Sequence, residues 1–437
     1  MYFRWVLYKH NLMRISFSKR HLLLVLLLIL MGMLAYQIQS TTDQSSFVSE
    51  AIQAVRNRLQ GDPFQSDAIL EPPFQSLTYG IQAFLWWDSG DAGTQLDWVE
   101  KLLGFTHVKH TFAWRDLEVR PGEWDFSQSD RIVAEVERRD LKLIARLGQV
   151  PDWALDGEVT SENSVRTDAP PTDLDVWANY CAMVADRYRG RIAAYQIWNE
   201  PNLSREWGDN PPDAAAYVEV LKACSDAIRT VDPDAILISA GLAPTGHYND
   251  LAHRDDIYLD AMYRAGFQQY VDVVGVHAPG FSPPSYGPDD AERDGQGRWA
   301  SFRRIEDLRK IMIQYDDAAR QMAILEMGWT TDTVNPDYSW FAVTEEEQAQ
   351  YIVEAYQYAA ENWRPWVGLI SLIYLGDPRW TAESEEWWWA ITTSSVDLRP
   401  AFFAIVSMDR YCDDMIIHGW PPGTPEEIYL EQRISCP

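Results

Sequence analysis

Residues 192–241 read IAAYQIWNEPNLSREWGDNPPDAAAYVEVLKACSDAIRTVDPDAILISAG. The first run, IAAYQIWN (192–199), and the last, AILISAG (235–241), are short and apolar, as is typical of strands buried on both faces. Between them, DAAAYVEVLKACSDAIRT (213–230) has apolar residues at helical spacing and ends shortly before Pro233. This order predicts two strands of a parallel sheet joined by a helix.

The same alternation of strand and helix repeats along the chain. The candidate strands are LTYGIQAF (77–84), THVKHTF (106–112), LKLIARLG (141–148), IAAYQIWN (192–199), AILISAG (235–241), VDVVGVH (271–277), MAILEMG (322–328) and VGLISLIYL (367–375). Amphipathic segments such as SFRRIEDLRKIMIQY and EEEQAQYIVEAYQYAAENW separate them. Eight such units predict an α/β fold, a (β/α)8 TIM barrel. A doubly wound open sheet is the alternative, but no Gly-x-Gly-x-x-Gly follows the first strand.

Composition limits both the size of the fold and the kinds of partner. The chain has 437 residues, 46% of them hydrophobic, so it can bury a sizeable core. It carries 37 Lys and Arg against 65 Asp and Glu, a net charge of −28, which disfavours contact with a phosphate backbone. We therefore expect no nucleic-acid partner. The 20 Trp and 21 Tyr exceed what a core of this size usually contains.

The N-terminus has the pattern of an export signal. Residues 1–20 contain basic but no acidic side chains, and the uncharged run LLLVLLLILMGMLAY (22–36) follows at once. The pattern predicts a retained signal anchor, which we favour because the cleavage site near Ala35 is poor, or a cleaved signal peptide. Either way, the basic flank places the rest of the chain outside the cytoplasm. The protein is then anchored in the membrane through residues 22–36, or secreted if they are cleaved.

The chain therefore divides into four expected regions. Residues 1–37 hold the basic N-terminus and the signal segment, and residues 38–75, rich in Gln, Ser, Asp and Pro, form a linker. Residues 76–410 hold the barrel, and residues 411–437 form a C-terminal tail.

The four cysteines form two candidate pairs. Cys181 and Cys224 lie on consecutive predicted helices, and Cys412 and Cys436 bracket the tail. Both pairs could be disulfides, which an exported protein would keep, or all four could be buried thiols. No Cys-x-x-Cys or Cys/His ligand spacing is present, so we expect no metal site and no cofactor.

Two glutamates lie at the C-terminal ends of predicted strands, where a barrel holds its active site. The fourth strand leads into Trp198-Asn-Glu-Pro-Asn202, which contains Glu200, and the seventh contains Glu326. Two carboxylates at one mouth suit acetal hydrolysis, in which one protonates the leaving oxygen and the other stabilises the anomeric centre. Asn199 is placed to bond the sugar 2-hydroxyl. A helix cap for Glu200 and a salt bridge for Glu326 are the alternatives.

These strand ends resemble the two catalytic motifs of the clan A glycoside hydrolases, Gln196-Ile-Trp-Asn-Glu-Pro-Asn202 for the acid and Ile324-Leu-Glu-Met-Gly-Trp329 for the nucleophile. Trp114-Arg-Asp-Leu-Glu-Val-Arg-Pro-Gly-Glu-Trp-Asp-Phe126 is similar to a stretch of families 39, 5 and 42. Gln149-Val-Pro-Asp-Trp-Ala154 resembles their turn after the third strand, and Leu398-Arg-Pro-Ala-Phe402 resembles the segment that closes the final helix.

The resemblance implies a role for each matching residue. Glu200 is implied as the general acid/base, Glu326 as the nucleophile and Asn199 as a contact to the 2-hydroxyl. The implied activity is a retaining glycosidase that hydrolyses O-glycosyl bonds, expected to be β, of an oligo- or polysaccharide by double displacement. A carbohydrate-binding protein without catalysis on the same barrel is the alternative.

The sequence also departs from the clan pattern. The sixth strand ends in His277-Ala-Pro-Gly280, where many members have His-x-Tyr, and the eighth ends at Tyr374 without an immediate tryptophan. Lys109 and His110 stand near the usual position of an arginine. Aromatic residues that follow strands are expected to stack on sugar rings. The candidate substrate-binding residues are Asn199, His277, Trp329, Trp153, Tyr374 and Trp380.

Overall fold

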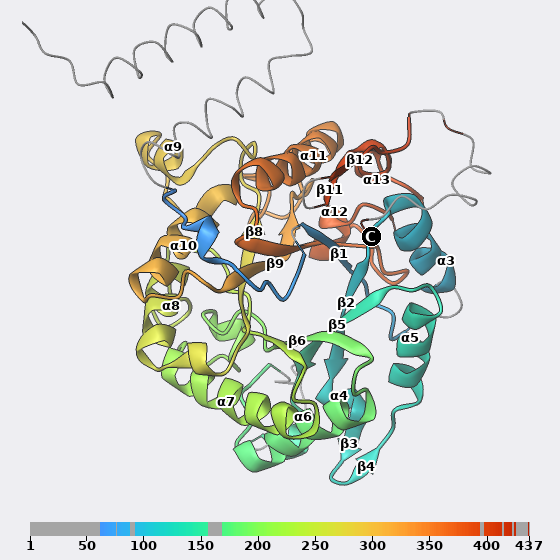
Figure 1. Ribbon diagram of the computed structural model, residues 1–437, viewed down its shortest axis with the longest axis vertical. Coiled ribbons are helices and arrows are strands. Elements are labelled where there is room, and N and C mark those ends of the chain that lie inside the picture. Colours follow the sequence, from blue (N-terminus) through green and yellow to red (C-terminus); the bar gives the residue numbers. More distant parts are fainter. Residues whose placement is uncertain are drawn as a thin grey trace, which may run out of the picture. The chain divides into compact units, whose positions relative to one another are not determined.

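The structure is a computed structural model that describes residues 62–75, 77–87, 92–155, 168–393, 397–412, 415–421, 424 and 436 (Figure 1). The expected signal segment, including residues 22–36, lies outside the described residues. The chain divides into two units, Met1–Pro63 and Phe64–Pro437, and the second holds the helices and strands given below. Within the described ranges, no helix combines the length and the apolar character needed to cross a membrane.

Eight parallel strands close into a barrel, as the sequence predicted. They are β1 (Thr78–Gln82), β2 (His107–Ala113), β5 (Lys142–Gly148), β6 (Ile192–Ile197), β7 (Ile236–Ile238), β8 (Val273–Pro279), β9 (Gln321–Gly328) and β10 (Val367–Leu372). Each strand pairs with the next in this order, and β10 pairs with β1 to complete the ring. Each overlaps the strand that was predicted for it, so the (β/α)8 barrel is confirmed.

Helices connect successive strands and surround the barrel (Figure 1). They are α3 (Ala92–Asp97), continued by a π-helical stretch (Trp98–Leu103), α5 (Ser127–Glu137), α6 (Leu174–Arg187), α7 (Ala214–Val231), α8 (Asp255–Arg264), α10 (Ile305–Gln314), α11 (Glu345–Asn362) and α13 (Pro400–Ser407). Side-chain caps define several starts: Asp173 accepts from the first turn of α6, and Thr344 and Glu347 form a capping box on α11.

The loops beyond the strand ends carry further short elements. These are α4 (Trp114–Leu117), the hairpin of β3 (Glu118–Arg120) and β4 (Glu123–Trp124), α9 (Pro288–Arg293) and α12 (Glu385–Trp389). They thicken the end of the barrel at which the strands terminate, where barrels of this kind hold their active sites.

The N-terminal arm, residues 64–75, packs on the barrel although its composition indicated a linker. Phe74 is buried with apolar residues from inside the barrel, and Gln321 exchanges two 3.0 Å hydrogen bonds with its backbone. The ring of Phe64 lies 5.2 Å from that of Trp366. The folded unit therefore begins at Phe64 rather than at residue 76. Its aromatic side chains close the end of the barrel opposite the strand ends.

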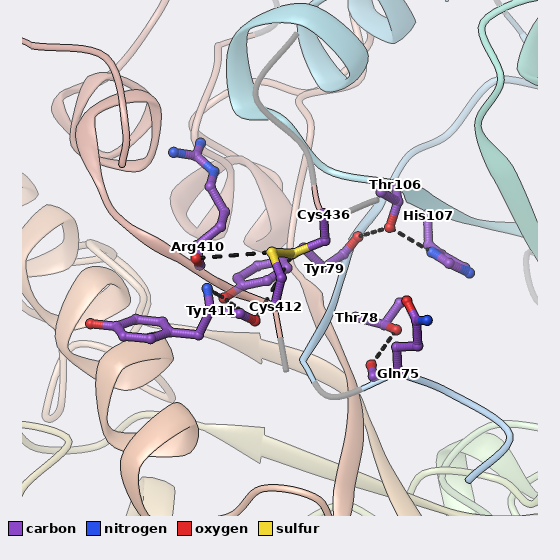
Figure 2. The surroundings of a disulfide bond; sticks show 9 residues. All are labelled: Gln75, Thr78, Tyr79, Thr106, His107, Arg410, Tyr411, Cys412 and Cys436. Atoms are coloured by element: carbon purple, nitrogen blue, oxygen red, sulfur yellow. Dashed lines mark hydrogen bonds between the residues drawn. A yellow bond between two sulfur atoms is a disulfide. The ribbon is translucent and has the colours of Figure 1, made fainter. Parts of the chain in front are cut away.

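Both cysteine pairs are bonded. Cys181 and Cys224 join α6 to α7, and Cys412 joins the end of β11 (Arg410–Cys412) to Cys436 in the tail (Figure 2). β11 pairs with β12 (Met415–Ile417) and contacts the barrel, where the Tyr411 N–H donates to the Tyr79 hydroxyl at 2.7 Å. The first part of the expected tail is therefore packed against the folded unit.

Candidate active site

Glu200 is held at the mouth of the barrel by an irregular backbone just after β6. Trp198 and Glu200 have φ angles of 73° and 37°, in the left-handed region that costs non-glycine residues of order 1 kcal/mol or more. Hydrogen bonds to neighbouring strands stabilise this conformation: Trp198 N–H donates to the Leu147 carbonyl at 2.9 Å, and Glu200 N–H donates to the Gly241 carbonyl at 3.1 Å. Such strain concentrates at functional sites, and here it turns the carboxylate into the mouth.

Glu326 lies on β9 and is paired with a lysine from β2, a strand that β1 and β10 separate from β9. Lys109, on β2, donates to Glu326 Oε1 at 3.2 Å and to the Leu325 carbonyl at 2.8 Å. Its side chain is almost fully buried and that of Glu326 nearly so. A buried carboxylate needs such a partner, because its charge would otherwise be strongly destabilised.

His277 connects the two glutamates. Its Nδ1 lies 2.8 Å from Glu200 Oε1 and 3.7 Å from Glu326 Oε2. Gly241 makes room for the ring, since a Cβ at that position would lie only 2.1 Å from His277 Cδ2. The donor atoms of Glu200, His277 and Glu326 all lie within 4.8 Å of one another. The two carboxylates therefore share one small space.

The charges around Glu326 keep it ionised. Burial alone would raise the pKa of this carboxyl, but the nearby charges of His277, Lys109 and Arg146 outweigh burial and lower it to about 2. Burial lowers the pKa of Lys109 to about 8 although Glu326 acts in the opposite direction. At neutral pH Lys109 is therefore mostly charged and Glu326 is a carboxylate, the form that a nucleophile needs.

Glu200 has a different environment. Arg205 Nη2 lies 3.5 Å from Glu200 Oε2, opposite the contact with His277. Glu206 lies nearby, and burial, together with the charges of Glu200 and Asp168, raises its pKa to about 8. A cation and a protonatable acid thus flank Glu200, whereas cations surround Glu326. Environments that differ in this way are typical of a carboxylate pair with two roles.

Three aromatic side chains form a wall where β1 and β10 end, and β10 pairs with the strand of Glu326. Phe84, after β1, lies 5.6 Å from Tyr374 and 4.9 Å from Trp380 between ring centroids, and Tyr374 lies 5.5 Å from Trp380. Burial raises the pKa of Tyr374 well above its ordinary value, and Glu326 contributes more to the shift than Glu200 does. We call Phe84, Tyr374 and Trp380 the aromatic wall.

The structure brings together most of the residues that were predicted for the site. Glu200, Glu326, His277 and Tyr374 interact at the mouth, with Trp380 beside them, and the half-buried Asn199 adjoins Glu200. The Asn199 Oδ1 accepts a 3.4 Å hydrogen bond from the Gln196 amide, which sets the direction of its own amide group.

Two tryptophans that were predicted to bind substrate, Trp329 and Trp153, make other contacts in the structure. Trp329 is fully buried, with its ring against Gly280 and its Nε1 bonded to the Ser282 carbonyl, so it belongs to the core and presents no ring face to a substrate. Trp153 is half-buried, and its Nε1 donates to the Glu118 carbonyl while its ring packs edge-on against Trp114. It supports the β3–β4 hairpin and joins none of the contacts around the glutamates that are described above.

Sequence reasoning missed several residues of the site. Arg146 lies on β5 within an otherwise apolar run, and it lowers the pKa of Glu326. A charge in a doubly buried strand is a usable signal, because it is costly unless paired. Phe84 is an aromatic residue at the end of a predicted strand, the same signal that singled out the tryptophans. Arg205 and Glu206 had none, since they stand in a loop of mixed polar residues.

The close grouping of Glu200, His277 and Glu326 is also compatible in distance with a metal ion. However, His277 already bonds Glu200, and the ammonium of Lys109 already supplies a cation beside Glu326. The expectation of no metal stays a prediction, which the effect of EDTA on activity tests. Taken together, fold and site define a (β/α)8 barrel with an asymmetric pair of glutamates at its mouth.

Comparison with known proteins finds glycoside hydrolases among the proteins to which this chain is similar. The chain is similar to a beta-xylosidase from Geobacillus stearothermophilus, 23% identical over 153 residues, and to endo-1,4-beta-xylanase A from Phanerodontia chrysosporium, 23% identical over 133 residues. The matches cover 31% and 29% of this chain and 30% of each relative, so the chain matches less than a third of their length. No model of a known protein family matches the chain.

Solved structures show the same fold. A family 39 glycoside hydrolase from Bacteroides cellulosilyticus is 20% identical with a TM-score of 0.56, covering 77% of this chain and 64% of that one. A monomeric beta-xylosidase from Caulobacter crescentus is 17% identical with a TM-score of 0.54, and the match covers 75% of this chain and 67% of that one. A xylanase from Thermotoga maritima is 15% identical with a TM-score of 0.50, and the match covers 75% of this chain and 93% of that one. These neighbours share the (β/α)8 barrel that the resemblance of the strand-end motifs to clan A glycoside hydrolases implied, and the first of them is itself called a glycoside hydrolase.

Proposed function

We propose that this chain is a retaining glycoside hydrolase that cleaves β-configured O-glycosidic bonds of an oligo- or polysaccharide. The observation that carries the proposal is the placement of Glu200 and Glu326 at one mouth, with donor atoms within 4.8 Å. Retaining glycosidases hold their carboxyl groups about 5–5.5 Å apart, whereas inverting enzymes leave about 6.5–9.5 Å for a water molecule. The close pair supports direct attack by one carboxylate.

The proposed reaction proceeds in two displacements. An oxygen of Glu326 attacks the anomeric carbon while the bond to the leaving oxygen breaks, and Glu200 gives its proton to that oxygen. Glu200, now a carboxylate, takes a proton from water, whose oxygen displaces Glu326 from the sugar. Each step inverts the anomeric centre, so the product keeps the configuration of the substrate.

The surrounding residues support this division of roles. Lys109 keeps Glu326 ionised and holds one of its oxygens, and His277 bonds Glu200 from inside the barrel. Asn199 stands beside Glu200 as the proposed contact to the sugar 2-hydroxyl. The half-buried rings of the aromatic wall follow β1 and β10, and β10 is next to the strand of Glu326, so they are the proposed stacking surface for the sugar under attack.

The names of the relatives indicate where to look for the substrate. Two of them are called xylosidases and two xylanases. We therefore propose β-1,4-linked xylo-oligosaccharides as the first substrates to test, with gluco- and manno-oligosaccharides beside them.

Isosteric substitution of the two glutamates tests the mechanism. Glu326→Gln and Glu200→Gln are expected to lower kcat by at least a thousandfold while circular dichroism shows that both variants remain folded, and Glu219→Gln on the exposed face of α7 serves as the matched control. A 2-fluoro-xyloside is expected to label Glu326, as peptide mass spectrometry would show. Full turnover by Glu326→Gln would refute the nucleophile, whereas sugar binding without product or label would indicate a binding protein.

We also propose that the folded unit works outside the cytoplasm. The basic and apolar N-terminal pattern supports this location, as do the two disulfides, which persist in oxidising compartments. A fusion of residues 1–61 to a reporter enzyme that is active only after export is expected to show reporter activity. An inactive but expressed fusion would contradict the location.

A further inference from the structure

A second group of aromatic side chains lies in the loops that follow β8 and β9. Phe281 is 5.2 Å from Trp299, 5.9 Å from Trp340 and 4.8 Å from Phe341 between ring centroids. Trp340 is 56% exposed, and the other three are half-buried. We call Phe281, Trp299, Trp340 and Phe341 the aromatic platform. The mechanism described above does not use it.

The platform belongs to the same end of the barrel as the two glutamates, because both loops start where parallel strands terminate. A chain of contacts leads from it to Glu200. The ring of Phe341 lies 6.1 Å from that of Tyr338, the Tyr338 side chain interacts with Arg205, and Arg205 lies 3.5 Å from Glu200. The platform is therefore continuous with the side of the mouth that holds Glu200.

The aromatic wall lies elsewhere on the rim. Around the barrel, β7 and β8 separate β6 from β9 on one side, and the platform loops follow β8 and β9. On the other side β5, β2, β1 and β10 complete the ring, and β1 and β10 lead into the wall. The wall follows β10, which pairs with the strand of Glu326, whereas the platform connects to Glu200 through Tyr338 and Arg205. The two aromatic surfaces thus occupy different parts of the rim.

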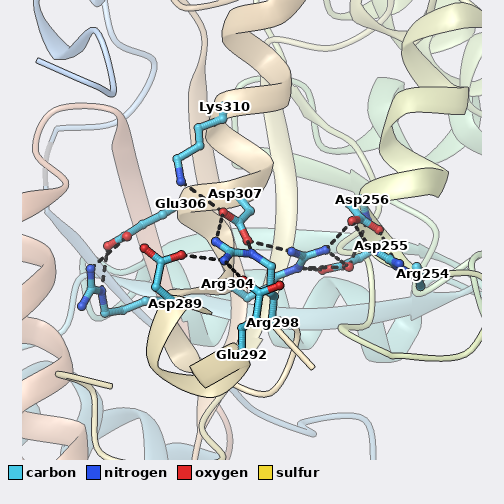
Figure 3. Close-up of polar contacts among 11 residues, drawn as sticks. Arg254, Asp255, Asp256, Asp289, Glu292, Arg298, Arg304, Glu306, Asp307 and Lys310 are labelled. Carbon is cyan, nitrogen blue, oxygen red and sulfur yellow. Dashed lines mark hydrogen bonds and ion pairs between the residues drawn. The ribbon is translucent and has the colours of Figure 1, made fainter. Parts of the chain in front are cut away.

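Ion pairs hold the platform loop in place (Figure 3). Arg298, next to Trp299, bonds Asp307 at 2.8 and 2.9 Å and Asp289 at 2.5 Å. The buried Arg304 bonds the same Asp307 at 2.9 Å and also reaches Asp255 on α8. These contacts fix the loop that carries Trp299 to two helices. A fixed loop loses little conformational entropy when it binds a ligand.

Local contacts also fix the orientation of the two tryptophans. The Trp340 Nε1 donates to the Asp337 carbonyl at 3.0 Å within its own turn. Trp299 packs closely on backbone, since a Cβ at Gly246 would lie 2.4 Å from its Nε1. An exposed, oriented aromatic face beside a catalytic mouth is a surface on which the apolar face of a sugar ring stacks.

We propose that the aromatic platform binds sugar units of the leaving group, so that the preferred substrate is a glycan chain extending beyond the cleaved bond. The inference rests on the proposed function, because it takes Glu200 as the acid that protonates the leaving oxygen. The sugar under attack lies over Glu326 beside the wall, and the rest of the chain passes Glu200 and reaches the platform. A rigid aromatic surface of this kind fits neutral β-1,4-linked pyranoses.

The experiment compares a long leaving group with a minimal one. Trp340→Ala is expected to lower kcat/KM for xylopentaose about ten times more than kcat/KM for β-xylosyl fluoride, whose leaving group is a single atom. Phe403→Ala, at a 57% exposed position on α13, is the matched control and is expected to leave the ratio unchanged. Equal losses for both substrates, or no loss for xylopentaose, would overturn the proposal.

A binding measurement separates this inference from the catalytic proposal. In the Glu326→Gln background, xylopentaose, cellopentaose and mannopentaose are titrated calorimetrically with and without Trp340→Ala. If the wild-type protein hydrolyses no glycoside but one pentaose binds and Trp340→Ala weakens it about tenfold, the platform is supported and the catalytic proposal fails. If no pentaose binds, or binding does not depend on Trp340, the platform is refuted.

Discussion

Replacement of Lys109 by methionine tests how the protein keeps Glu326 ionised. Lys109→Met preserves most of the buried volume but removes the ammonium that lies 3.2 Å from Glu326 Oε1. It also removes the 2.8 Å hydrogen bond to the Leu325 carbonyl. The variant therefore changes charge and hydrogen bonding at one side of the carboxylate and leaves His277 in place on the other.

The size of the effect follows from the distance. Two unit charges 3.2 Å apart attract each other by about 5 kcal/mol at an effective dielectric constant of about 20, and removing one partner of a buried pair typically costs about 3–5 kcal/mol. At about 1.4 kcal/mol per pKa unit, a loss of about 3 kcal/mol raises the pKa of Glu326 by about 2 units. We therefore expect a rise from about 2 to about 4.

The sign of the pH effect is set by this shift. The pKa of Glu326 in the folded protein is lower than the unfolded value of about 4.5, so its charge stabilises the fold above pH 4.5 and this contribution is lost as the pH falls towards 2. In Lys109→Met this contribution is largely absent. The lost stability is partly offset, because the variant no longer buries an ammonium whose pKa burial lowers to about 8.

The assay is the dependence of kcat/KM on pH between 3 and 9. The acidic limb is expected to move from below pH 3 in the wild type to about pH 4 in Lys109→Met, so that kcat/KM of the variant at pH 3 falls about tenfold below its own value at pH 6.5. Lys222→Met, on the surface of α7, is the matched control. An acidic limb at the same pH in both proteins would show that Lys109 does not hold the nucleophile ionised.

Three further variants test other parts of the structure. Gly241→Ala places a Cβ 2.1 Å from His277 Cδ2, so the ring must move, and we expect kcat/KM to fall at least tenfold; unchanged kinetics would contradict the close packing. Glu206→Gln is expected to raise Tm by a few degrees at pH 7.5 but not at pH 4. Because the pKa of Glu206 is raised from 4.5 to about 8 in the folded protein, ionisation of its carboxyl favours the unfolded chain above pH 4.5. An equal change in Tm at both pH values would contradict the raised pKa of Glu206. Cys181→Ala with Cys224→Ala opens a loop closed over 43 residues and is expected to lower the free energy of unfolding in urea by about 4 kcal/mol; no loss would show that the bond does not constrain the unfolded chain.

The barrel and its catalytic pair could be predicted because their signals are local. A strand buried on both faces is an apolar run whatever its neighbours are, and a helix reveals itself by its own spacing. Glu200 and Glu326 stand at the ends of such runs, and the rule that strand ends of a barrel share one mouth placed them together. Neither step required knowledge of a distant contact.

The start of the folded unit could not be predicted in this way. Phe64 and Phe74 are isolated aromatic residues in a polar segment, which is the composition of a linker. Their burial depends on Trp366 and Gln321, which lie hundreds of residues away in the chain. No local pattern records a contact of that kind.

By itself, the sequence determined the barrel, the two glutamates and their order along the chain. Only the tertiary structure decided which side chains surround them. It brings Lys109 to Glu326 from β2, which β1 and β10 separate from β9, and it separates Trp329 from Trp380, although both follow strands. Trp329 is buried because Gly280 has no side chain to exclude its ring, whereas Trp380 joins the aromatic wall. The physical reason is that strand register and the packing of loops set these distances, and both arise only when the barrel closes.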